Sequence, residues 1–215
     1  MNNDVIQSTI DFAKCELAKY ESGHDWYHTY RVWSVAKKIA EQEKADLFVV
    51  ELAALLHDIA DAKFHDGNEE IGSIVASKFL KLQNVSFEII EKVVYIIRNI
   101  SFKSEGIEKS KKTIEFQIVQ DADRLDAIGA IGIARAFAFG GFKNHKIFDP
   151  EIPPALNMTK AEYKNHKSTS INHFYEKLLK LKNLMNTEAG RALALKRHKF
   201  LEKYLEQFFE EWNGL

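Results

Sequence analysis

Four residues of this 215-residue chain have side chains that together could hold a transition-metal ion. His57 and Asp58 are adjacent, His28 lies upstream, and Asp123 lies far downstream. Two imidazoles and two carboxylates form a borderline N/O donor set, which suits Mn²⁺, Fe²⁺, Co²⁺, Ni²⁺ or Zn²⁺ better than Mg²⁺. Four protein ligands on an octahedral ion leave two positions for water and substrate. The pattern therefore predicts metal-assisted hydrolysis.

Each fragment alone also fits a structural role. An isolated His57-Asp58 pair fits a polar pair at a helix end, and an isolated His28 fits a hydrogen-bonded core histidine. Asp123 fits a helix cap or an ion-pair partner of Arg124. The metal site is favoured because all the fragments occur together and in this order.

Apolar residues recur at steps of three and four around the upstream histidine, which predicts a helix. Asp25 is the expected N-cap of this helix, so His28 falls in its first turn and shares a face with Val32. The positive end of the helix dipole disfavours an imidazolium there. The position therefore favours the neutral, ligating form of His28.

The other ligands also lie on predicted apolar stripes. A helix from about Asp46 to Ile59 ends with His57 and Asp58, and Asp58 continues its inner face. A carboxylate on a buried face is costly unless it is paired or bound to a metal. Asp123 lies one turn after Val119 and is expected to face inward as well.

Helical periodicity extends along the rest of the chain, and no run alternates long enough to suggest a sheet. We therefore expect an all-α fold. The additional helices are expected at about residues 6–20, 32–40, 68–82, 86–100, 114–139, 160–186 and 188–212. Gly140-Gly141 are expected to end the helix that starts near residue 114. Gly129 and Gly132 form a small-residue face suited to close helix packing.

The three prolines all lie between residues 150 and 154, in the segment 149–154. This Pro-rich connection separates a helical core, about 20–140, from a C-terminal helical pair, about 160–212. The apolar stripe of that pair is expected to pack on the core. We therefore expect one domain over residues 1–215, a helical bundle with an added C-terminal helical pair.

Composition is typical of a globular protein, with 46% hydrophobic residues, 28% charged residues and a formal net charge of -1. This balance argues against a dedicated nucleic-acid binder, which would carry a basic excess. The apolar run 127–142 contains Arg135 and glycines, which argues against a membrane span, and no leader precedes the first helix. We expect a cytoplasmic protein, with Cys15 as a small core residue.

The sequence resembles a known family. His28-x-x-Arg31-Val32, His57-Asp58 and Ala122-Asp123-Arg124-Leu125 look like the H…HD…D signature of the HD-domain superfamily of metal-dependent phosphohydrolases. The longer phrases at 23–28, 100–102, 121–132 and 172–178 are similar to small bacterial HD hydrolases, so the resemblance spans about residues 20–212.

The resemblance implies an all-helical HD fold and one divalent ion held by His28, His57, Asp58 and Asp123. Asp121 and Asp126 are alternatives for the fourth ligand, and Asp123 is preferred because it matches the Ala-Asp-Arg-Leu phrase of nucleotide-hydrolysing members. Mn²⁺ is a frequent ion in the family and is the expected cofactor, with Fe²⁺, Co²⁺, Ni²⁺ and Zn²⁺ as alternatives.

Other polar residues near these motifs are candidates for catalysis and substrate binding. Asp61 is the expected general acid or base, and its position matches an acidic residue of related HD hydrolases. Its alternatives are a helix cap and an ion pair with Lys63. Lys63, Lys103 and Arg124 are expected to bind substrate phosphates, although a lone lysine is commonly solvated. Arg124 could equally form a structural ion pair beside the metal ligands.

Together these features predict a metal-dependent phosphohydrolase that acts on a small phosphorylated molecule. A nucleotide is the favoured substrate. The sequence leaves open a monoester or the pyrophosphate bond of a nucleoside triphosphate. Alternatives are a cyclic-nucleotide phosphodiesterase and a non-catalytic nucleotide- or metal-binding module. The segment His65-Asp66-Gly67-Asn68 lacks the Gly-Tyr-Pro element of cyclic-dinucleotide enzymes. Neither a nucleic-acid polymer nor a membrane is expected as a partner.

Overall fold

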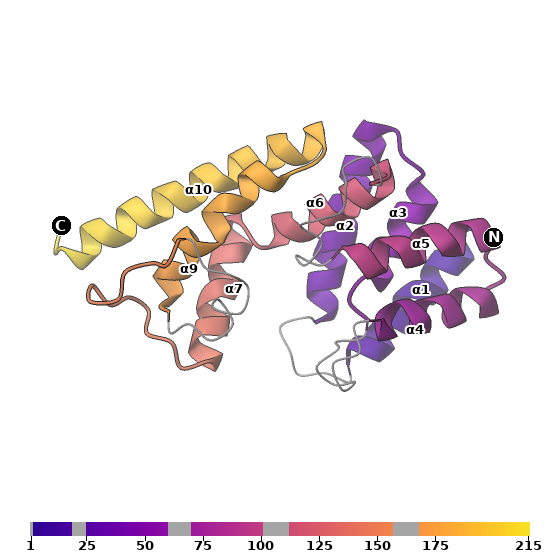
Figure 1. Ribbon diagram of the computed structural model, residues 1–215, viewed down its shortest axis with the longest axis horizontal. Coiled ribbons are helices and arrows are strands. Elements are labelled where there is room, and N and C mark those ends of the chain that lie inside the picture. Colours follow the sequence, from indigo (N-terminus) through magenta and orange to yellow (C-terminus); the bar gives the residue numbers. More distant parts are fainter. Residues whose placement is uncertain (1, 19–24, 60–69, 101–111, 157–167) are drawn as a thin grey trace. The chain divides into compact units, whose positions relative to one another are not determined.

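The computed structural model describes residues 2–18, 25–59, 70–100, 112–156 and 168–215. Within these ranges the chain forms helices and no strand, which confirms the all-α prediction (Figure 1). The helices are α1 (Asn2–Leu17), α2 (Trp26–Glu43), α3 (Leu47–Leu56), α4 (Ile71–Leu82), α5 (Phe87–Asn99), α6 (Ile114–Asp126), α7 (Gly129–Phe142), α9 (Ser170–Glu176), the 3-10 helix η4 (Leu178–Leu184) and α10 (Glu188–Trp212).

Contacts divide the chain into two units, Met1–Asp123 and Arg124–Leu215. The division falls inside α6, three residues before that helix ends. One domain over residues 1–215 stays a prediction. Among the helices of the described ranges, none is by itself long and apolar enough to cross a membrane, and only the bent pair α6 and α7 passes that test by length and composition.

Helix α3 is the central helix of the first unit and packs against α1, α2 and α5 (Figure 1). Its sequence is apolar except for Glu51, and seven of its residues are buried. A helix that is apolar on all sides belongs inside a core. The side chain of Asp46 caps it by accepting hydrogen bonds from the backbone N–H groups of Phe48 and Val49. The helix ends at Leu56, so His57 and Asp58 lie just past its last turn.

Helix α2 begins where the sequence predicts. The carboxylate of Asp25 accepts a hydrogen bond from the backbone N–H of His28 at 2.7 Å, which confirms Asp25 as the N-cap. The helix closes at Lys44, which adopts the left-handed conformation. Its buried face runs from His28 through Val32 to Ala40 and packs on α3. The first ligand candidate is thus anchored at a capped helix start.

The prediction of one helix over 114–139 is wrong, because the structure has two helices there. Helix α6 ends at Asp126, and α7 begins at Gly129, whose φ of 79° is a conformation that residues with a Cβ rarely adopt. The apolar periodicity continues across this break, so the pattern conceals it. Gly140 and Gly141 do not end the helix either, since α7 continues to Phe142.

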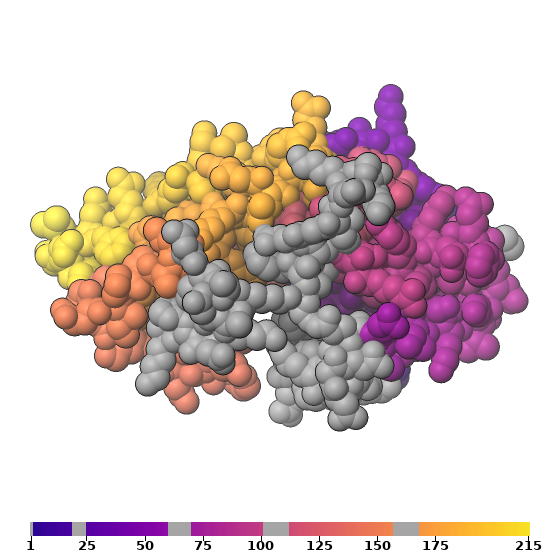
Figure 2. All heavy atoms as spheres, viewed as in Figure 1, coloured from indigo at the N-terminus to yellow at the C-terminus, as the bar shows by residue number. Residues whose placement is uncertain are grey.

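The second unit is built around α10, which packs against α7 and η4. The helix predicted over 160–186 is short in the described residues: α9 covers Ser170–Glu176 and a 3-10 helix follows, while 160–167 lie outside the described residues. Helix α10 matches its predicted bounds. The ring of Tyr204 in α10 stacks on the ring of Phe174 in α9, with centroids 5.8 Å apart. Figure 2 shows the yellow C-terminal half of α10 at the molecular surface.

The prediction for Cys15 is wrong. Its side chain is exposed on α1, whose buried face is formed by Ile6, Thr9, Ala13 and Leu17. Those positions follow steps of three and four, and Cys15 lies between the last two of them. A small apolar residue next to a stripe therefore does not have to belong to it.

Candidate metal centre

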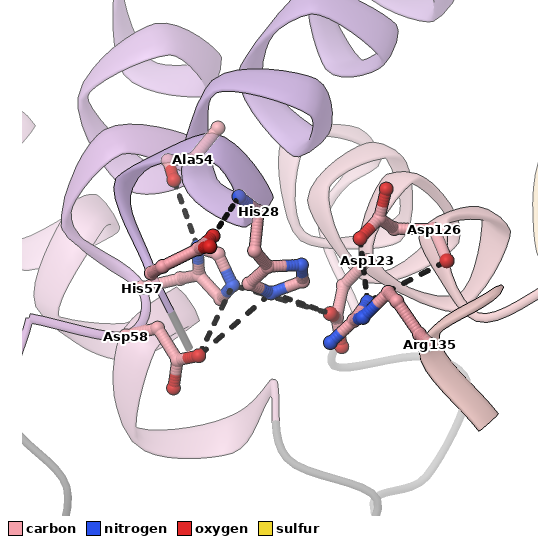
Figure 3. A network of polar contacts seen from close by, with 8 residues as sticks. His28, Ala54, His57, Asp58, Asp123, Asp126 and Arg135 are labelled. Carbon is pink, nitrogen blue, oxygen red and sulfur yellow. Dashed lines mark hydrogen bonds and ion pairs between the residues drawn. The ribbon is translucent and has the colours of Figure 1, made fainter. Parts of the chain in front are cut away.

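His57 has one ring nitrogen held by the backbone and the other turned toward the remaining candidates (Figure 3). Its Nδ1 lies 2.8 Å from the carbonyl oxygen of Ala54. A carbonyl oxygen only accepts, so Nδ1 carries the proton and Nε2 keeps its lone pair. Nε2 is buried and has no hydrogen-bond partner in the described part of the chain. A histidine that ligates a metal typically shows this arrangement.

His28 lies beside His57. The two rings meet edge to face with centroids 5.4 Å apart, and their side chains are only 2% and 4% exposed. They come from the start of α2 and the end of α3, two helices that pack against each other. Helix packing therefore brings together two imidazoles that are distant in sequence.

The carboxylates of Asp58 and Asp123 complete the cluster. Asp58 Oδ2 lies 3.7 Å from His28 Nε2 and 4.0 Å from His57 Nε2. Asp123 Oδ1 lies 3.5 Å and 4.0 Å from the same two nitrogens (Figure 3). The two carboxylate side chains are 27% and 38% exposed, less buried than the sequence pattern suggests. The two imidazoles are thus buried, and the two carboxylates are partly exposed to solvent.

These separations fit a shared divalent ion. Ligand atoms about 2.1 Å from a metal lie roughly 3.0 Å apart at right angles and about 4.2 Å apart across the ion. The four distances of 3.5–4.0 Å between the imidazole nitrogens and the carboxylate oxygens fall inside that range. The ligand atoms of His28, His57 and Asp58 also lie within 4.8 Å of one another. The residues present therefore fit a mixed N/O metal site.

The alternatives for the fourth ligand have different surroundings. Asp126 is 3% exposed, and its Oδ2 pairs with Arg135 Nη1 at 2.5 Å. Asp121 is fully buried. Asp123, at the end of the first unit, has its carboxylate within 4.0 Å of both imidazoles. Asp123 as the fourth ligand stays a prediction, because the cluster whose ligand atoms all lie within 4.8 Å of one another contains His28, His57 and Asp58.

The remaining predicted site residues are placed less fully. Asp61, Lys63 and Lys103 lie outside the described residues. Arg124 is half-buried and donates a hydrogen bond from Nη1 to the carbonyl oxygen of Leu184. Its role in substrate binding stays a prediction.

Sequence reasoning missed the groups that support the ligands. The Ala54 carbonyl has no side-chain signature, and only the position of His57 at a helix C-terminus hints at it. Arg135 was noted only as a charge that interrupts an apolar run. Arg135 is the single charged residue of α7, and a lone charge in an apolar helix indicates a buried partner.

Comparison with known proteins agrees with this geometry. Residues 25–128 match the protein family described as HD domain. The protein YpgQ of Bacillus subtilis (strain 168) is 42% identical over 200 residues, which cover 93% of this chain and 89% of YpgQ. The crystal structure of an HD-superfamily hydrolase from Bacillus thuringiensis is 45% identical, covers 100% of both chains and has a TM-score of 0.81. The chain belongs to the HD family.

Another solved HD-family relative carries a ligand. The crystal structure of Bacillus subtilis YpgQ in complex with ADP is 35% identical by structural alignment, covers 98% of this chain and 96% of that chain, and has a TM-score of 0.78. HD domains bind divalent metal ions, and here His28, His57 and Asp58 form a cluster with the donor atoms for one.

Proposed function

We propose that this protein is a divalent-metal-dependent phosphohydrolase that acts on a nucleotide, at a phosphate monoester or at the pyrophosphate bond of a nucleoside triphosphate. The observation that carries the proposal is the cluster of two buried imidazoles and two partly exposed carboxylates from His28, His57, Asp58 and Asp123. The HD-superfamily hydrolase of Bacillus thuringiensis supports hydrolysis, and the ADP complex of YpgQ supports a nucleotide substrate. Mn²⁺ is the proposed ion.

A divalent ion in this site would supply an acidified water and would polarise a phosphoryl oxygen. The residues of the chain prepare the site for it. The Ala54 carbonyl holds Nδ1 of His57, which leaves Nε2 directed at the other candidate ligands, and the capped start of α2 fixes the position of His28. The carboxylates of Asp58 and Asp123 balance the charge of the ion. Their partial exposure leaves a route for a phosphate group from solvent.

Proton transfer and substrate binding are assigned to residues near the ligands. We propose Asp61 as the group that takes a proton from the attacking water or returns one to the leaving group. We propose Lys63, Lys103 and Arg124 as cations that bind phosphate oxygens. To do so, the guanidinium of Arg124 must bind a phosphate oxygen while it also donates a hydrogen bond to the carbonyl oxygen of Leu184.

A turnover assay with Mn²⁺ on a panel of nucleotides tests the proposal. The panel contains nucleoside mono-, di- and triphosphates and cyclic nucleotides, and the products are separated and identified. Inorganic phosphate with a nucleoside would indicate a monoesterase. Pyrophosphate with a nucleoside monophosphate would indicate cleavage of the pyrophosphate bond. Either result supports the proposal, and His57→Ala should abolish both.

Two other outcomes would contradict it. Hydrolysis of cyclic nucleotides alone would make the protein a phosphodiesterase. Nucleotide binding without turnover, at full Mn²⁺ occupancy, would make it a non-catalytic module. Metal occupancy is measured on the same samples, so that an inactive preparation without metal is not mistaken for a binding module.

A further inference from the structure

The C-terminal end of α6 is held by two arginines from other helices. Arg197 of α10 donates from Nη1 to the carbonyl oxygen of Leu125, and Arg135 of α7 donates from Nη1 to that of Asp126 at 3.5 Å. The last carbonyls of a helix have no partner within it, and cations are favourable at its negative end. We call Arg135 and Arg197 the arginine clamp. The contacts named here lie within the second unit.

The carboxylate of Asp126 pairs with one arginine of the clamp, Arg135. Its Oδ2 is 2.5 Å from Arg135 Nη1, and the side chain is 4% exposed. Burial lowers the pKa of Arg197, and the nearby charge of Asp126 opposes that effect. Only the Asp126 side of this ion pair is buried, since the Arg135 side chain is 32% exposed, and loss of Arg135 would leave the buried carboxylate without its partner. The clamp therefore holds one geometry for the end of α6.

Gly129 and Gly132 allow close packing in and around the turn that follows α6. A Cβ on Gly129 would lie 3.1 Å from Arg197 Cγ, so the side-chain stem of Arg197 rests directly on this residue. A Cβ on Gly132 would lie 2.3 Å from the carbonyl oxygen of Ala127. The backbone of the turn and the arginine stem are thus packed as closely as glycine allows.

We infer that Arg197 is a positioning residue for the metal ligand Asp123. Asp123 lies one helical turn before Asp126 on α6, and the clamp holds the carbonyls of Leu125 and Asp126. The direction of a helical side chain follows the backbone that carries it, and a displacement of about 1 Å is enough to weaken a metal site. The inference rests on the proposed function only in taking Asp123 as a metal ligand.

Mn²⁺ affinity, measured by calorimetry without substrate, tests the inference. Arg197→Met keeps most of the stem on Gly129 but removes the guanidinium, and it should weaken Mn²⁺ binding about tenfold, the lower end for groups that orient ligands. Arg191→Met is the matched control. Arg191 is exposed on the same helix and donates to the carbonyls of Met185 and Asn186 instead. It should leave the affinity unchanged, even if both variants lose similar thermal stability.

A second pair of variants changes the turn without touching a charge. Gly129→Ala forces a Cβ onto a φ of 79° and against Arg197, so it should also weaken Mn²⁺ binding. Gly141→Ala is its control in α7, because a Cβ on Gly141 meets nothing within 4 Å. This pair keeps the inference testable if Arg197→Met does not fold.

A double-mutant cycle decides whether the effect passes through Asp123. In an Asp123→Ala background, Arg197→Met should no longer change the remaining Mn²⁺ affinity. Wild-type affinity in both Arg197→Met and Gly129→Ala, or an undiminished effect of Arg197→Met without Asp123, would overturn the inference. Wild-type protein that binds Mn²⁺ but hydrolyses no nucleotide would contradict the proposed function alone. Wild-type protein that binds no Mn²⁺ would contradict both.

Discussion

Asp123 Oδ1 lies 3.5 Å from His28 Nε2, although the two residues belong to helices at opposite ends of the first unit's sequence. Helix α2 supplies a buried imidazole, and the last turn of α6 supplies a carboxylate that is 38% exposed. The carboxylate of Asp58 lies 3.7 Å from the same imidazole nitrogen, so two carboxylates and two imidazoles meet here. A divalent cation is the natural counter-charge for that arrangement.

Purified protein should therefore contain, or take up, about one divalent transition ion per chain. The physical reason is the cluster of two imidazole nitrogens and two carboxylates formed by His28, His57, Asp58 and Asp123. Elemental analysis and titration with Mn²⁺ measure it. The His57→Ala/Asp58→Ala double variant should take up none at this site, and uptake equal to that of the wild type would refute the assignment.

Removal of the metal should lower the melting temperature. An ion at about a hundredfold above its Kd stabilises the folded state by about 3 kcal/mol. For a chain of this size that corresponds to about 5–10 °C. Melts with and without a chelator measure the difference. The His57→Ala/Asp58→Ala variant is the control and should be insensitive to chelator, whereas equal midpoints for the wild type would contradict the prediction.

Asp61→Asn should leave Mn²⁺ binding nearly intact and slow turnover by roughly 10²–10⁴, the usual contribution of a general acid or base. The proposed set of four ligands does not include Asp61, so its loss should affect proton transfer rather than the ion. Steady-state kinetics and Mn²⁺ titration on the same variant separate the two. Loss of the ion would make Asp61 a ligand, and full activity would make it a structural residue.

Nucleotide selection should be led by phosphate. The proposed binding groups Lys63, Lys103 and Arg124 are cations, and aromatic stacking tolerates any base. Nucleoside triphosphates that differ in the base should have kcat/KM values within about tenfold to a hundredfold, since a pocket of this kind discriminates by only ~1–3 kcal/mol. Lys63→Ala and Lys103→Ala should mainly raise KM. A ten-thousandfold preference for one base would point instead to a dedicated base pocket.

Folding stability should fall as the pH drops below about 6.5, in part through His173. Burial lowers the pKa of this imidazole from 6.5 to about 4, with Lys177 and His145 adding to the shift. Because the unfolded chain then binds a proton that the folded chain resists, the contribution is complete above pH 6.5 and is lost as the pH falls toward 4. It amounts to about 3 kcal/mol.

Denaturant unfolding at several pH values measures this dependence. His173→Gln has no such proton to exclude, so its stability should vary less than that of the wild type between pH 6.5 and pH 4. Parallel curves for the two proteins would show that His173 titrates normally in the folded state.

Much of the first unit could be predicted from local sequence. Asp25 is the predicted N-cap, and Asp46, predicted only as the approximate start of a helix, is an N-cap as well, because a carboxylate before an apolar stripe satisfies the free N–H groups of a helix start. The choice of His28, His57, Asp58 and Asp123 depended on residue types and their order, and the all-α fold followed from periodicity. These features are encoded within one or two helical turns.

Tertiary structure decided what depends on contacts distant in sequence. The break between α6 and α7 is hidden by an uninterrupted apolar pattern, and it coincides with Gly129, which has a φ of 79° and lies against the side-chain stem of Arg197. Whether Asp123 or Asp126 faces the imidazoles depended on which helix each carboxylate meets, and Arg135 takes Asp126. The sequence by itself determined which side chains the chain offers to a metal ion. The packing of helices determined which of them meet, since a buried carboxylate that is paired with a guanidinium, as Asp126 is with Arg135, is no longer available as a ligand.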